Sequence, residues 1–182
     1  MNSLRAIGKV YKRHPLVGNM LLYVGLYGAG DISRQIILRE KTQDSKLDFK
    51  SAARMSTVGS LLIAPFNYNF YRILDKVVLG SGARIVFTKI VCDQVFSTPI
   101  AICIFYIGIA IVERRKDLFS ELKEKGLQTY ATGAVYWSCV QTFNFALLPT
   151  HLRAPYVGFC AFFWCNILSY FKSRRSQRRD TT

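Results

Sequence analysis

The sequence has few of the residues on which catalytic and metal sites depend. Its two histidines, His14 and His151, have no nucleophile placed to act with them. Its five cysteines show no CxxC or Cys/His spacing, so no zinc site is expected. Phosphate-loop and dinucleotide fingerprints are also missing. We therefore expect no metal, no cofactor and no enzymatic activity, and we interpret the cysteines as small buried apolar side chains.

Charge is missing from five long stretches of the chain. These uncharged stretches are residues 14–30, 55–71, 94–112, 126–152 and 154–171, each 17 to 27 residues long. A helix needs about 20 apolar residues to cross a bilayer. Such stretches, in a chain of 182 residues that is 51% hydrophobic with a mean hydropathy of +0.17, argue against a soluble fold. We predict one integral membrane domain over residues 1–182, an all-α polytopic bundle in the lipid bilayer.

Acidic residues are also scarce, 11 against 25 Lys and Arg, which gives a net charge of +14. The basic residues gather at the edges of the uncharged stretches and in a basic tail, 172–182. This placement is typical of juxtamembrane anchors that contact anionic lipid headgroups. Direct binding to nucleic acid is therefore not expected, although the net charge alone would suggest it.

Four to five spans are predicted. They lie near residues 15–38, 51–78, 85–112, 130–148 and 155–171, with an amphipathic interfacial helix over 113–126. Five spans put the 39–54 loop, the 113–125 segment and the tail on one side of the membrane, whereas four put both basic termini on one side. No cleavable secretory signal is expected. The basic first residues fit either mitochondrial targeting or an interfacial helix.

Ionisable residues recur inside the predicted spans. Three acid–base pairs lie within about one helical turn, where each pair shares a face and can neutralise itself: Asp31 with Arg34, Arg72 with Asp75, and Lys89 with Asp93. Asp93 is the best candidate for a functional charge, since Lys89 is the only basic partner on its own helix. Carboxamides add to the set: Gln35, Gln94, Gln141 and Asn144. Together these groups either line a polar passage or tie helices together, at about 0.6 kcal/mol each.

One polar stripe stands out in the uncharged stretch 126–152. Trp137, Gln141, Asn144, Phe145 and Leu148 fall at i, i+4, i+7, i+8 and i+11, so a helix places them on one face. Pro149 is expected to end this helix, and Arg153 to mark the return to water.

The spacing from Trp137 through Gln141, Asn144, Phe145 and Pro149 to Arg153 resembles the signature of the Mpv-seventeen family. This family includes the twenty-two-kilodalton peroxisomal membrane protein and mitochondrial inner-membrane relatives. Other motifs resemble the same family, so the likeness covers nearly the whole chain; they are Gly30-Asp31 with Gln35, Asp93-Gln94 with Pro99, and Trp164. At the second motif, where the family usually has Gly-Pro, this chain has Ala64-Pro65. Departures from the family pattern, among them Ser138 after the signature Trp, resemble the Mpv-seventeen-like branch.

The resemblance implies an integral protein of the mitochondrial inner membrane, with the peroxisomal membrane as the alternative. It also implies a channel-like role tied to reactive oxygen species and mitochondrial DNA maintenance. Our leading hypothesis is a pore for small polar metabolites or ions, lined by the polar groups above, and a homo-oligomer is compatible with it. The alternative is a non-conducting scaffold that binds partners through its basic tail and its amphipathic segment.

Overall fold

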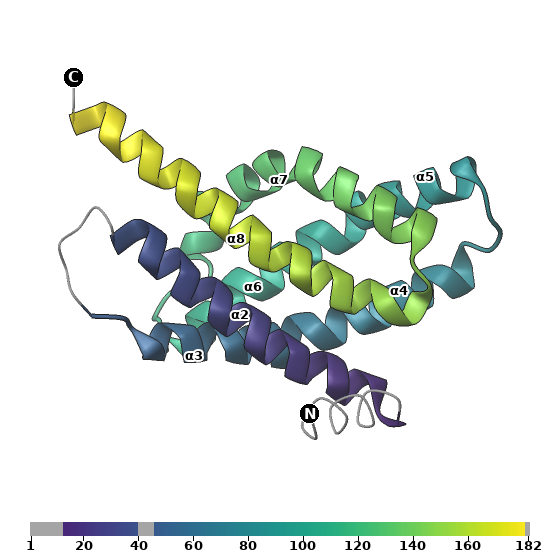
Figure 1. The fold of residues 1–182 in the computed structure, drawn as a ribbon, viewed down its shortest axis with the longest axis horizontal. Coiled ribbons are helices and arrows are strands. Elements are labelled where there is room, and N and C mark those ends of the chain that lie inside the picture. Colours follow the sequence, from purple (N-terminus) through teal and green to yellow (C-terminus); the bar gives the residue numbers. More distant parts are fainter. Residues whose placement is uncertain (1–12, 40–45, 181–182) are drawn as a thin grey trace, which may run out of the picture.

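The computed structural model describes residues 13–39 and 46–180. The basic segment 1–12, considered above as a targeting or interfacial helix, lies outside these residues. Within them the chain forms five long helical rods and no strand, which agrees with the all-α prediction (Figure 1). Two rods are each interrupted by a π-helical turn. The elements are α2 (Pro15–Arg39), α3 (Phe49–Val58), η1 (Gly59–Ile63), α4 (Ala64–Val77), α5 (Ala83–Cys92), η2 (Asp93–Ser97), α6 (Thr98–Val112), α7 (Ser120–Leu147) and α8 (Thr150–Asp180).

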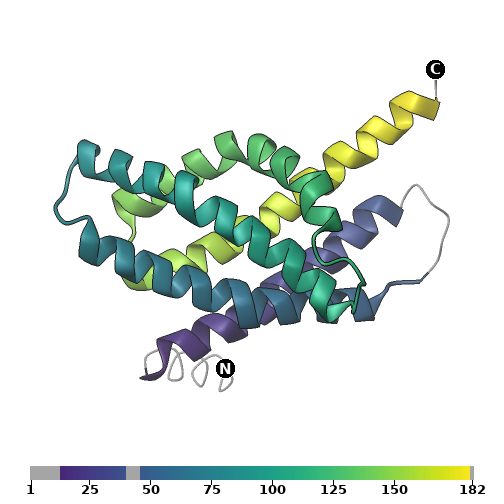
Figure 2. The ribbon, with the colours of Figure 1, turned by 180° about the vertical axis from the view of Figure 1, so that it is seen from behind.

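The rods run back and forth between two ends of the molecule. At one end, here called the turn end, residues 78–82 join α4 to α5 and residues 148–149 join α7 to α8 (Figure 1). At the other, the loop end, lie residues 46–48 before α3 and residues 113–119 between α6 and α7 (Figures 1 and 2). Helix α8 also finishes at the loop end, packed along α2. Residues 46–48, residues 113–119 and the end of α8 thus lie at the same end of the bundle.

The 113–126 segment differs from the prediction. No separate interfacial helix forms there, because α7 begins at Ser120 and continues without a break to Leu147. Gly126, expected to close the interfacial helix, is buried within α7. A Cβ added to it would lie close to Leu122 of the same helix and to Ile102 of α6. The amphipathic pattern was real, but its apolar side packs on α6 as the first turns of a longer helix. The fourth predicted span, 130–148, is therefore the later part of α7.

Pro65 and Pro99 each follow a π-helical turn. The backbone N–H of Ala64 bonds to the carbonyl of Gly59, and the N–H of Thr98 bonds to the carbonyl of Asp93, five residues earlier in each case. Proline has no N–H, and its ring crowds the carbonyl four residues before it. A wider turn at that point relieves the crowding, and single π turns are frequent at functional sites. Pro155, by contrast, lies inside α8 with no such turn recorded.

The distribution of polarity is the reverse of that in a soluble protein. Asn19 and Asn144 are fully buried, whereas large apolar side chains face outward on every rod. Leu21, Phe87 and Val135 are 52%, 67% and 76% exposed. Such outer faces fit contact with lipid rather than water.

Composition alone identifies fewer spans than the sequence predicted. Among the described helices, Ala83–Val112 is the one with both the length and the apolar content of a membrane span, with a mean hydropathy of 2.3. The other rods carry polar or charged side chains on their inner faces, which lowers their average. The count of four to five spans therefore stays a prediction.

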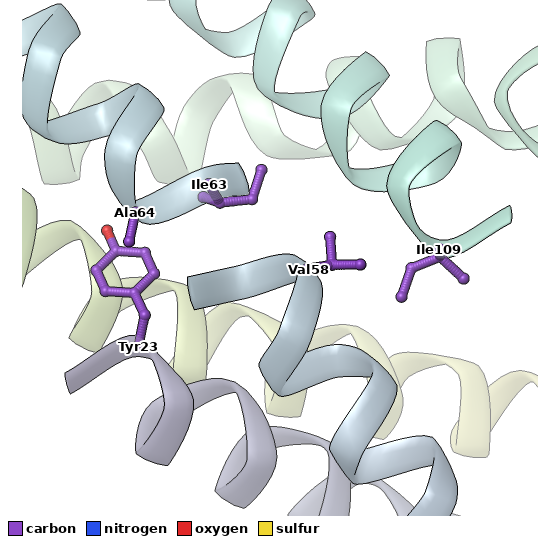
Figure 3. Packing of buried hydrophobic residues seen from close by; sticks show 5 residues of the cluster. All are labelled: Tyr23, Val58, Ile63, Ala64 and Ile109. Carbon is purple, nitrogen blue, oxygen red and sulfur yellow. The ribbon is translucent and has the colours of Figure 1, made fainter. Parts of the chain in front are cut away.

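An apolar core joins five of these elements, α2, α3, η1, α4 and α6. It consists of Tyr23, Val58, Ile63, Ala64 and Ile109 (Figure 3). The helices approach closely here: a Cβ placed on Gly59 would lie 2.4 Å from the ring of Tyr27. This contact packs α2 directly against the rod formed by α3, η1 and α4.

Candidate functional site

A cavity of about 560 Å³ lies between the helices, and all five rods contribute to its lining. It reaches from charged residues at the loop end to buried polar residues in the interior of the bundle. Its charged mouth consists of Arg54, Glu113, Arg115, Glu121 and Lys125. Its floor consists of Asn67, Tyr71, Asp93, Ser97 and Gln141. The site therefore joins an ionic surface to a buried polar interior.

The mouth is held together by a chain of ion pairs. Arg115 bridges two acids, at 2.5 Å from Nη2 to Oε2 of Glu113 and 3.2 Å from Nη1 to Oε2 of Glu121. Glu121 also accepts from Nζ of Lys125 at 2.8 Å, and Glu113 lies 3.4 Å from Nε of Arg54. The bond from Lys125, aided by Arg115, lowers the pKa of Glu121. The acids of the mouth are thus each matched by basic groups.

Hydrogen bonds fix the polar side chains of the floor. Nε2 of Gln141 donates to Oη of Tyr71 at 2.9 Å, and Nδ2 of Asn144 donates to Oε1 of Gln141 at 2.7 Å. Nδ2 of Asn67 donates at 3.1 Å to Oη of Tyr23, which itself donates to the carbonyl of Ala154 at 2.8 Å. These bonds link α7, α4, α2 and α8 around the floor.

Asp93 is the exception on the floor. It is 2% exposed and begins η2, yet no ion pair to it occurs in the described part of the chain. Its Oδ2 receives one long contact, at 3.5 Å, from Oγ1 of Thr98, and its Oδ1 has no hydrogen-bond partner among the described residues. A buried carboxylate without a cation is costly. A buried acid that lacks a counter-ion is a candidate for a functional residue.

Aromatic rings form much of the wall between mouth and floor. The six that line the cavity are Tyr27, Tyr71, Phe105, Tyr106, Trp137 and Trp164. The rings of Trp137 and Trp164 lie 6.3 Å apart, centroid to centroid, and bring α7 and α8 together. These side chains give the cavity a mostly apolar wall with electron-rich faces.

A second polar group, the ion cluster, lies at the turn end and contributes nothing to the cavity lining. It consists of Asp75, Lys89, Thr150 and Arg153. Nζ of Lys89 lies 2.6 Å from Oδ1 of Asp75, which also accepts from Arg153, while Oδ2 accepts from the Thr150 hydroxyl. Arg153 also donates to the carbonyl of Leu148 at 3.1 Å. The cluster fastens α4, α5 and α8 to one another.

The predicted acid–base pairs have different outcomes. The pair of Asp31 and Arg34 is confirmed at 2.6 Å. The pair of Arg72 and Asp75 is wrong, because Arg72 is exposed and donates to Oη of Tyr68 at 3.0 Å. The pair of Lys89 and Asp93 is wrong as well, because Lys89 reaches across to Asp75 on the neighbouring rod. Spacing along a helix permits a pair, but contacts between helices decided these two.

Arg153 was expected at the return to water, and that expectation is wrong. Its side chain is 8% exposed, binds Asp75 and lies over the ring of Phe145 at 5.2 Å. The helix following Pro149 turns straight back into the bundle, which carries Arg153 inward. Phe145 in turn packs edge-on against Tyr71, with centroids 5.8 Å apart. The family motif around Pro149 thus builds the ion cluster and its apolar surroundings.

The remaining predicted residues fall in several places. The stripe on α7 is confirmed as inward-facing, since Gln141, Asn144 and Phe145 are buried. Gln35 lies near the loop end, where Nε2 donates to Asp31 and Oε1 accepts from the N–H of Asp48. Gln94 is half-buried and does not line the cavity.

The structure also places the family-motif residue Gly30 and the cysteines. Gly30 is buried on α2, where an added Cβ would meet Phe162 of α8 at 3.6 Å. The cysteines are not all buried as expected: Cys160 is buried and three are half-buried, but Cys139 is exposed.

Sequence reasoning missed the tyrosines that anchor the floor. Tyr71 is 2% and Tyr23 0% exposed, and each hydroxyl takes part in the floor's hydrogen bonds. The signal was present: Tyr71 lies four residues from both Asn67 and Asp75, on the same face of α4. A tyrosine between two inward polar residues is a good candidate for an inward hydroxyl.

Comparison with known proteins identifies the chain's relatives. The Mpv17 / PMP22 family profile matches residues 110–169. An Mpv17-like protein of Xenopus laevis is 36% identical over 171 residues, which cover 94% of this chain and 83% of that protein. The PXMP2/4 family protein 2 of Dictyostelium discoideum is 32% identical over 168 residues, or 86% of this chain and 84% of the relative. The mitochondrial inner membrane protein Mpv17 of Caenorhabditis briggsae is 27% identical over 184 residues, covering 100% and 99%. No solved structure matches the chain.

These relatives confirm the predicted location. The chain is a membrane protein tied to mitochondria, and its place is the mitochondrial inner membrane, with the peroxisomal membrane as the alternative. The similarity extends over most of this chain and most of each relative, well beyond the region that carries the profile match. The chain belongs to the Mpv17 / PMP22 family.

Proposed function

We propose that the protein provides a path through the membrane for small polar solutes, and that the cavity is the part of this path open to the loop end. The observation that carries the proposal is the course of the cavity, from the ionic mouth to Asp93 in the interior of Ala83–Val112. Polar interiors in membrane bundles mark solute pathways, because such groups are costly there unless they serve one. The proposal includes no catalytic step and no cofactor.

In this conformation the path is closed at the turn end, where the ion cluster joins three helices. Solute passage would require the rods around the floor to shift. The two π-helical turns, at Gly59–Ile63 and Asp93–Ser97, are the natural places for such a shift, because their backbone hydrogen bonds are already displaced from the α-helical pattern. Any links to reactive oxygen species and mitochondrial DNA maintenance would then follow from solute exchange.

The proposal is tested by blocking the cavity from within. Ala101 lines the cavity, whereas its neighbour Ile100 is 46% exposed on the outer face of the same helix. In proteoliposomes that release small polar solutes, a bulky thiol reagent should lower the flux through Ala101→Cys towards that of protein-free liposomes. Because the native Cys165 also lines the cavity, both variants are made in a Cys165→Ser background. The reagent should leave the flux through Ile100→Cys and through that background unchanged.

The scaffold alternative makes the opposite prediction. With a non-conducting protein, the solute flux stays at the level of protein-free liposomes at any protein loading, and planar bilayers show no current. Its binding of partner proteins would instead be lost when residues 172–182 are removed. Absence of flux in well-folded protein would overturn the pore proposal.

A further inference from the structure

The cavity combines one unpaired buried carboxylate with an aromatic wall. We propose that it binds small organic cations, that is, protonated or quaternary amines, with Asp93 as the counter-charge. This inference rests on the proposed function in one respect, because it names the class of solute that would use the path.

The first step is the charge of the cavity. At the mouth, Glu113 and Glu121 are each paired with basic side chains, and Arg34 is paired with Asp31. On the floor, Asp93 is the one acid, and its Oδ1 has no hydrogen-bond partner among the described residues. The mouth carries three basic side chains against two acidic ones, so the negative charge that is left without a counter-ion lies on the floor, at Asp93. An anionic solute would be repelled there, and a cationic one would supply the missing partner.

The second step is the chemistry of the floor around Asp93. The side chain of Gln141 is already used, since Nε2 donates to Tyr71 and Oε1 accepts from Asn144. The amide of Asn67 donates to Tyr23. Each amide nitrogen keeps a second N–H, and Ser97, Gln141 and Thr98 lie near the carboxyl of Asp93. Its Oδ1 nevertheless has no hydrogen-bond partner among the described residues and remains for a bound solute.

The third step is the chemistry of the wall, which favours organic over inorganic cations. A bare divalent ion requires several oxygen ligands, and the described residues hold no group of three His, Cys, Asp or Glu side chains that could bind a metal ion. The six aromatic rings that line the cavity offer electron-rich faces instead. Carboxylate and aromatic faces together are the usual way proteins recognise substituted ammonium groups.

The chain offers a direct optical test. Trp137 and Trp164 are its two tryptophans, and both line the cavity. Tryptophan fluorescence of the purified full chain in detergent therefore reports on cavity occupancy. Choline is the cationic probe, and 3,3-dimethyl-1-butanol, which has the same shape without the charge, is the neutral control in the wild-type protein.

Choline should change the fluorescence saturably, and the neutral alcohol should change it much less. Asp93→Asn should weaken choline binding about tenfold or more, as expected for loss of a charged partner. The matched control is Glu124→Gln, which removes a carboxylate from the exposed surface of α7 outside the cavity and should leave binding unchanged.

Equal responses to choline and the alcohol in the wild-type protein would overturn the inference, whatever the folding of the variants. So would unchanged choline binding in Asp93→Asn. The outcome is separable from that of the pore proposal. Choline binding without any solute flux would leave this inference standing and overturn the pore, whereas flux without preference for cations would do the reverse.

Discussion

Asp75 and Asp93 are two acids on neighbouring rods of one bundle, the first half-buried and the second buried, and their surroundings are opposite. Both oxygens of Asp75 are occupied, by Lys89, Arg153 and Thr150. Asp93 has only uncharged neighbours, Ser97, Thr98 and Gln141, and its Oδ1 has no hydrogen-bond partner among the described residues. The same side chain therefore serves two purposes. At the turn end it holds helices together, and at the cavity floor it is left available.

The difference extends to the regions around the two acids. The ion cluster draws α4, α5 and α8 into contact and lies outside the cavity lining. The floor opens into about 560 Å³ of space that continues to the loop end. The ion cluster and the cavity are thus separated along the length of the bundle, and substitutions at the two acids should have opposite effects on stability.

The largest effect is expected from Asp75→Asn. This change keeps the shape of the side chain but leaves the buried cations Lys89 and Arg153, 9% and 8% exposed, without their counter-charge. Breaking a buried ion pair by removing one partner costs about 3–5 kcal/mol. The free energy of unfolding, measured by denaturant titration in detergent micelles, should fall by that order. Glu124→Gln, on the exposed surface of α7, is the control, and an equally small loss in both variants would contradict a structural role for the cluster.

A smaller effect of opposite sign is expected from Asp93→Asn. The wild-type carboxylate is buried without a cation, so replacing it by a neutral amide removes an uncompensated cost. We expect a gain of about 1 kcal/mol in the same titration. A loss as large as that in Asp75→Asn would show that Asp93 is a structural acid, and the contrast between the two would disappear.

Part of this contrast was predictable from the sequence. The inward stripe of Gln141, Asn144 and Phe145 follows from helical periodicity alone, and so does the pair of Asp31 and Arg34 within one turn of α2. Five helical rods also follow, because uncharged stretches of sufficient length are a local property of the chain.

The partners of Asp75 were not predictable in this way. Lys89 lies on the next rod and Arg153 at the start of the last, so their meeting depends on how the helices pack. Local spacing instead favoured Arg72 for Asp75 and Lys89 for Asp93. The consequence was that Asp93 looked paired, and its isolation, on which the proposed site depends, emerged only from the arrangement of the rods. The cavity could not be predicted from the sequence either, because side chains from all five rods line it.

The smallest effect is expected at the mouth, from Glu121→Gln. Glu121 is 25% exposed, and ion pairs so close to solvent contribute about 0.2–1 kcal/mol. Because Lys125 and Arg115 lower its pKa in the folded protein, its contribution to stability is present at neutral pH and is lost as the pH falls through the folded value. The difference in unfolding free energy between wild type and Glu121→Gln should therefore be small at neutral pH, shrink with added salt, and vanish once the pH lies below the lowered pKa of Glu121 in the folded protein. A loss at neutral pH that matched that of Asp75→Asn would place the main fastening of the bundle at the mouth, and a cavity fastened there could not be the open end of a path.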